Sequence, residues 1–136
     1  MLGVLEKVLI LRDSSLFIGL SGEELYPVAE IAQSALFSTG NLVVREGDPG
    51  DALFVVASGT FQIEKAGTKL REIRAGAVFG EVALLDGAPR AASVVALTDG
   101  QLLRIPRAEF EALLDESPEL ARGVIRTLIG HLRGGP

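Results

Sequence analysis

The chain contains no cysteine and a single histidine in its 136 residues. Without cysteine it forms neither disulfides nor thiolate metal sites, which fits an intracellular protein. We therefore expect a cytoplasmic location, alone or as the cytosolic domain of a larger protein. The lone His131 cannot complete a metal site or a Ser-His-Asp arrangement. No metal site, catalytic residue or enzyme activity is expected.

The chain also has fewer basic than acidic residues. Lys and Arg number 13 against 18 Asp and Glu, so the formal net charge is −5. Nucleic-acid surfaces need a basic face, and none is predicted here. No apolar run is long enough to span a bilayer, and residues 4–11 lack the basic start and cleavage site of a signal peptide. A 48% apolar, 23% charged composition predicts one compact folded domain.

The first part of the chain has the pattern of helices. Apolar residues at helical spacing predict a short amphipathic helix over 3–11. Ser21 is followed three residues later by Glu24, which is the pattern of a capping box and predicts a helix over 22–33. Residues 1–33 are therefore expected to form an N-terminal helical segment.

After the helices the periodicity changes to that of strands. Short β-type runs are separated by glycine-rich turns, at 35–39, 42–46, 52–57, 60–66, 68–73, 91–97 and 100–105. Many short strands at regular spacing predict a β-sandwich or a jelly-roll barrel. The expected class is α+β, mainly β, with a roll of about eight short strands over 34–105.

The chain returns to helix at its end. Pro106 is placed to be the first residue of a helix over 106–115. Ser117 precedes Pro118 and is a suitable cap for a second helix over 118–133. These helices make up the expected C-terminal part of the single domain, residues 106–136.

The most informative segment is FGEVALLDGAPRAA, residues 79–92. Gly80 opens a predicted helical turn, where free backbone N–H groups favour an anion. Arg90 adds a cation that can hold phosphate oxygens in a bidentate manner. Glu81 suits a neutral donor better than a phosphate, and a sugar hydroxyl is the natural partner. Together these groups predict a singly charged phosphate joined to ribose, as in a cyclic nucleotide.

The run FGEVALLDGAPRAASV resembles the phosphate-binding cassette of cyclic-nucleotide-binding domains, the family of catabolite activator protein and the protein kinase A regulatory subunit. The family pattern is F-G-E-x-A-L, a short gap and R-[AST]-A, and every fixed position matches. Residues 44–59 resemble a second motif of the family. The resemblance extends over roughly residues 16–133 and implies a β-roll between helices.

The resemblance implies roles for the cassette residues. Arg90 is expected to bind the phosphate and Glu81 the ribose 2′-hydroxyl, although Glu81 can equally cap the helix that it begins. The other positions expected to contact phosphate or ribose, several through their amides, are Gly80, Val82, Ala83, Ala91 and Ala92. In the family a hydroxyl residue in place of Ala91 can donate to guanine. The alanine therefore favours cAMP as the ligand and leaves cGMP open.

The base pocket is less well defined by the sequence. Candidate lining residues, each also suited to an ordinary core, are Val56, Val78, Phe79 and Val94. No aromatic residue follows the cassette except Phe110, so an aromatic cap on the final helix is not expected. Arg126 or Arg133 could lie over the base instead.

The resemblance implies that ligand binding moves the final helix, which can also form a dimer. The chain looks like a sensor without its output, either a small protein by itself or one module joined to an effector domain. The alternative is a β-roll scaffold for protein contacts that no longer binds nucleotide.

Overall fold

The computed structural model describes residues 2–81 and 87–133. Within them, eight strands form two antiparallel four-stranded sheets, with orders β1-β8-β3-β6 and β2-β7-β4-β5. The strands are β1 (Gln33–Phe37), β2 (Leu42–Val44), β3 (Ala52–Ser58), β4 (Phe61–Lys65), β5 (Thr68–Ile73), β6 (Val78–Phe79), β7 (Ser93–Ala96) and β8 (Gly100–Pro106). The predicted α+β class with a jelly roll is confirmed.

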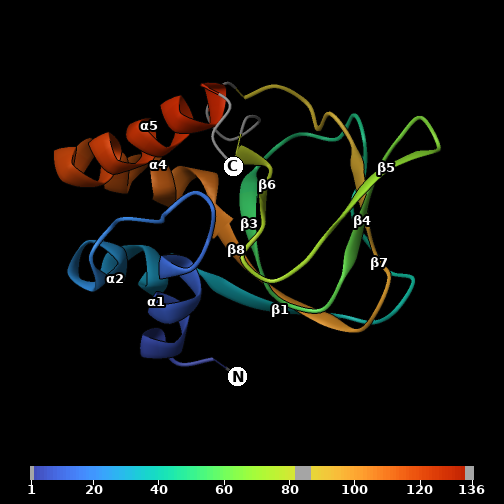
Figure 1. Cartoon of the computed structure of the whole chain (residues 1–136), viewed down its shortest axis with the longest axis horizontal. Coiled ribbons are helices and arrows are strands. Elements are labelled where there is room, and N and C mark those ends of the chain that lie inside the picture. Colours follow the sequence, from blue (N-terminus) through green and yellow to red (C-terminus); the bar gives the residue numbers. More distant parts are fainter. Residues whose placement is uncertain (1, 82–86, 134–136) are drawn as a thin grey trace.

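The described helices gather at one side of the roll (Figure 1). They are α1 (Val4–Arg12), α2 (Gly22–Ile31), α4 (Arg107–Glu116) and α5 (Pro118–Leu132). The predicted capping box is present, because Ser21 Oγ accepts from Glu24 N at 3.1 Å while Glu24 Oε1 accepts from Ser21 N at 3.1 Å. Ser117 Oγ accepts from Leu120 N at 3.2 Å, which caps α5 as predicted. No helix in the described ranges has the length and hydropathy needed to cross a membrane.

The prediction that Pro106 is the first helical residue is wrong. Pro106 ends β8 opposite Ala52 and has an extended ψ of 140°. Helix α4 starts one residue later, where Arg107 N donates to Asp51 O at 2.9 Å. Proline's fixed φ suits a helix start and an extended strand end equally, and pairing with β3 decides between them.

Two strand predictions need correction. β1 occupies 33–37 instead of 35–39, because α2 already ends at Ile31. A turn at 38–41 follows β1, and in it Ser38 N donates to Asn41 Oδ1 at 2.8 Å. β6 was not predicted at all. It has two residues, too few to show a period of two, and its position is set by pairing with β3.

Strand β3 belongs to both cores of the molecule. Leu53 and Val55 point to the cluster that includes the helices, whereas Phe54 and Val56 point into the roll. Successive side chains in a strand alternate between faces, so β3 is a nearly continuous apolar run that is buried on both sides. The residues at its start, where the site lies, are therefore held by packing on two faces.

This arrangement predicts unequal effects of two leucine truncations. Leu103 of β8 is fully buried against the helices, whereas Leu36 of β1 is 79% exposed. We expect Leu103→Ala to lower the free energy of unfolding by about 2–5 kcal/mol through lost burial and cavity formation. Leu36→Ala should change it by about 0.5 kcal/mol or less. Urea denaturation of the two variants would measure this, and equal losses would contradict the burial of Leu103 against the helices.

Candidate functional site

A pocket of about 250 Å³ lies between one sheet and the cassette segment. Its sheet wall is a single row of facing residues that crosses four strands. Val44 of β2 pairs with Val94 of β7, Val94 with Ile63 of β4, and Ile63 with Arg71 of β5. All four line the pocket. The wall is therefore apolar, with one guanidinium at its end.

The opposite side of the pocket carries most of the predicted site residues. Those on this side are Val78, Phe79, Gly80, Glu81, Arg90, Ala91 and Ala92, whereas the predicted Val94 lies on the sheet wall. Val82 and Ala83 lie outside the described residues. The sequence thus brings together the two charged groups of the predicted site, Glu81 and Arg90, on one pocket.

Three predicted base-pocket residues lie elsewhere in the structure. Val56 is fully buried in the roll, and its backbone bonds Gly76 and Ala77. Arg126 lines a separate hollow beside Ile18–Leu20. Arg133 is exposed where α5 ends. None of the three lines the pocket described above, so their contact with a base stays a prediction.

Arg90 is a buried arginine that is only partly satisfied. It is 6% exposed, its Nη2 donates to Ala52 O at 2.8 Å, and its guanidinium lies 5.6 Å from the centre of the Phe54 ring. Its Nη1 is buried and has no hydrogen-bond partner among the described residues. Burial lowers the pKa of the Arg90 guanidinium, but arginine stays charged in proteins. A buried charged donor without an acceptor is costly, so an added acceptor at Nη1 would reduce that cost.

The backbone of Arg90 is fixed by the loop that precedes β3. Arg90 N donates to Asp48 O at 2.8 Å, and Gly47 N donates to Arg90 O at 2.9 Å. Pro49 and Pro89 form an isolated bridge beside these bonds. This explains in physical terms why residues 44–59 matter to a site at 79–92: they hold its arginine in place.

Glu81 is the second unsatisfied charged group of the pocket. Its Oε2 is buried and accepts no hydrogen bond from residues 2–81 or 87–133. Burial raises the pKa of the Glu81 carboxyl, while its own backbone amide and the charges of Arg71 and His131 lower it. A carboxylate oxygen in such a place favours a ligand with a hydroxyl or amine donor.

Gly80 connects the two charged groups and has no room for a side chain. Its φ is +87°, and an added Cβ would collide with Arg90 Nη1 and stand 3.0 Å from Ala52 O. Both the left-handed backbone and the lack of a side chain therefore favour glycine here. The lack of a side chain lets Arg90 Nη1 pack directly against the Gly80 backbone.

Two groups near the site escaped the sequence reasoning. Arg71 follows the alternation of β5, since it lies two residues before the buried Ile73 and so shares its inward face. That parity was readable in the sequence. Asp51, which stands 3.7 Å from Arg90, gave no such signal, because its neighbour is distant in the chain.

Comparisons with known proteins agree with this geometry. The family model of the cyclic nucleotide-binding domain matches residues 35–117. The cGMP-dependent protein kinase egl-4 of Caenorhabditis briggsae is 40% identical over 94 residues, 69% of this chain and 13% of the kinase. The cyclic AMP receptor protein of Thermus thermophilus is 35% identical over 128 residues, 90% of this chain and 59% of that protein.

A solved structure supports the same assignment. The regulatory domain of Toxoplasma gondii PKA, crystallised with cAMP, has a TM-score of 0.73 and 33% identity over 81% of this chain and 44% of that one. The chain belongs to the cyclic nucleotide-binding domain family, and it is a regulatory binding domain. It spans less than two thirds of the length of the relatives named here.

The crowding at Gly80 can be tested against a glycine with the same backbone. Gly67 has a φ of +79° and open space around it. Alanine at either position should cost about 1–2 kcal/mol for the left-handed backbone. Gly80→Ala should cost a further 1–3 kcal/mol, roughly, because Arg90 must move. Thermal and urea unfolding would measure both, and equal costs would contradict the close contact.

Proposed function

We propose that this domain binds cAMP, with the cyclic phosphate on Arg90 and the ribose 2′-hydroxyl on Glu81. The observation that supports it best is a pair of buried atoms on one small pocket, Arg90 Nη1 and Glu81 Oε2, that have no partner among the residues the structure describes. One lacks an acceptor and the other lacks a donor. A cyclic nucleotide supplies both from adjacent atoms, the phosphate oxygen and the neighbouring hydroxyl.

The proposed arrangement also uses the rest of the pocket. The side-chain-free backbone at Gly80 would let the phosphate approach its amide, with Ala91 and Ala92 beside it. Val82 and Ala83 are assigned to the same cradle by the family pattern alone. The base would lie along the valine and isoleucine row of the sheet wall. Ala91 offers no hydroxyl to a guanine, which favours cAMP over cGMP.

We further propose that binding is transmitted to α5. The charge of His131 in the last turn of α5 acts on the Glu81 carboxyl, so this end of the helix lies within electrostatic reach of the pocket. A ligand that neutralises the buried charges would shift α5 between positions, limited by its differential affinity for them. Exposed Ile125, Ile129 and Leu132 give α5 an apolar face for a second copy or an effector domain.

The phosphate role of Arg90 can be tested by removing its charge. Arg90→Met should weaken cAMP binding by about tenfold to a hundredfold, because charge-assisted hydrogen bonds contribute roughly 1.5–3 kcal/mol each and 1.4 kcal/mol is one decade. Isothermal titration calorimetry at fixed salt measures the affinity, with 5′-AMP as a ligand control. Arg74→Met is the matched control, since Arg74 is exposed and pairs with Glu72. Equal affinity of Arg90→Met and wild type would overturn the proposal.

The ribose role of Glu81 needs a different comparison. Glu81→Ala and 2′-deoxy-cAMP each remove one side of the proposed hydrogen bond, and each should weaken binding by about tenfold. Combined, they should weaken it by little more than either alone, because the same interaction is lost once. If the two losses of affinity multiply in this calorimetric cycle, Glu81 does not bind the 2′-hydroxyl.

A further inference from the structure

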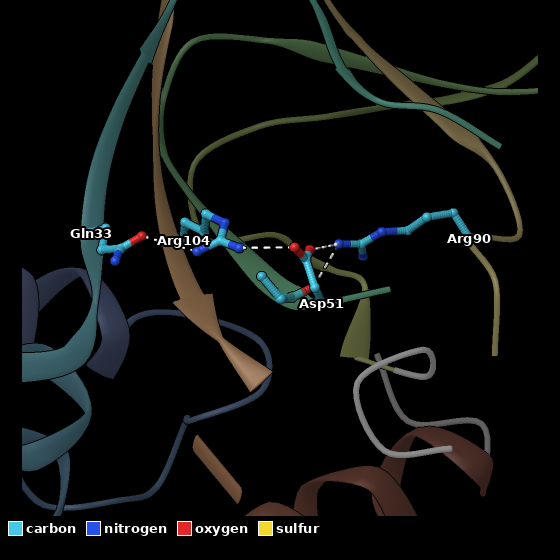
Figure 2. A network of polar contacts seen from close by, with 5 residues as sticks. Gln33, Asp51, Arg90 and Arg104 are labelled. Atoms are coloured by element: carbon cyan, nitrogen blue, oxygen red, sulfur yellow. Dashed lines mark hydrogen bonds and ion pairs between the residues drawn. The ribbon is translucent and has the colours of Figure 1, made fainter. Parts of the chain in front are cut away.

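Arg90 shares a carboxylate with a second arginine. Asp51, which lies directly before β3, stands between the two guanidinium groups (Figure 2). Its Oδ2 accepts from Arg104 Nη2 at 3.1 Å, whereas its Oδ1 is 3.7 Å from Arg90 Nη2, beyond a hydrogen bond. The carboxylate is thus engaged by Arg104 and only close to Arg90.

Arg104 is held in place from its other side as well. It lies on β8, opposite Gln33 of β1 and Phe54 of β3. Its Nη1 donates to Gln33 Oε1 at 3.0 Å, so the row Gln33, Arg104, Asp51, Arg90 crosses the sheet (Figure 2). A guanidinium with donors bound on two sides has a fixed orientation.

The two arginines differ in exposure, and this difference decides what an ion pair with Asp51 would do at each of them. The Arg90 side chain is 5% exposed, that of Arg104 is 32% exposed, and that of Asp51 is 71% exposed. A pair between exposed groups is weak and exchanges easily with water. A carboxylate that closed onto the buried Arg90 would instead neutralise the cation that is proposed to hold the bound anion.

We propose that Arg104 is an affinity-determining positioning residue, which hydrogen-bonds Asp51 and so keeps that carboxylate from closing onto Arg90. Arg90 then retains its charge and its free Nη1 for the phosphate. This inference rests on the proposed phosphate role of Arg90. Arg104 does not line the pocket, and it would control ligand affinity through Asp51.

The test is a double-mutant cycle measured by calorimetry with cAMP. Arg104→Met keeps the apolar stem and removes the guanidinium, and we expect it to weaken binding about three- to tenfold, in the range of couplings within one charged network. Asp51→Asn removes the competing charge. In that background Arg104→Met should have no effect beyond about twofold, because nothing remains to close onto Arg90.

Other results would overturn the inference. An equal weakening in the Asp51→Asn background would mean that Arg104 merely attracts the anion over distance, and no weakening in wild type would mean that it does not matter. Arg74→Met, a charge-matched change in the exposed pair with Glu72, controls for net charge. Urea unfolding of every variant controls for folding.

Two further variants keep the test decisive. Should Arg104→Met not fold, Gln33→Ala removes the other hydrogen bond of Arg104 without changing charge, and it should weaken binding in the same Asp51-dependent way. Arg90→Met separates the two proposals. If it leaves affinity unchanged, or if wild type binds no cyclic nucleotide, the proposed function fails. If it alone loses binding while Arg104→Met and Gln33→Ala bind like wild type, only the role of Arg104 fails.

Discussion

The structure of the site depends on one buried, half-satisfied guanidinium. Arg90 donates to the Ala52 carbonyl with Nη2, and its Nη1 has no partner in the described ranges. Removing a charge from water costs several kcal/mol unless hydrogen bonds and an opposite charge replace the solvent. Part of that cost is offset by the Ala52 carbonyl, which is fixed because β3 is buried on both faces. The turn at 47–48 fixes the backbone of Arg90. An anion can offset the rest.

Strand β3 is therefore central to the structure of the site. The strand packs on the helices with one face and on the roll interior with the other, so the Ala52 carbonyl at its start cannot shift without disturbing both clusters. Phe54 of the same strand stacks on Phe79 at 5.0 Å between ring centres and lies under Arg90. The guanidinium is therefore positioned by two contacts from a single strand, the Ala52 carbonyl and the Phe54 ring. Rigid placement of this kind reduces the conformational cost of binding.

Some features of the fold and of the site could be predicted from the sequence, and others could not. The capping box at Ser21 and the cap at Ser117 could be predicted because their signals are local. The cassette could be predicted because Gly80, Glu81 and Arg90 lie close together in the chain. β6 could not, since a two-residue strand exists only through its partner β3. Asp51 and Arg104 are separated by 53 positions, and no local pattern indicates that a carboxylate before one strand will meet a guanidinium on another.

The placement of Glu81 gives the last step of the argument. An acid and a base buried on one small pocket would ordinarily form an ion pair, and such a pair would close the site. Within the described part of the chain, neither Glu81 Oε2 nor Arg90 Nη1 has a partner. Both keep the cost of burial, which makes the unpaired arrangement less stable than a paired one. A ligand with an anionic group and a neighbouring hydroxyl donor relieves both costs at once, whereas free phosphate or a neutral sugar relieves one. Selectivity for a phosphate joined to a sugar would then follow from two separate deficits that only the combined ligand removes.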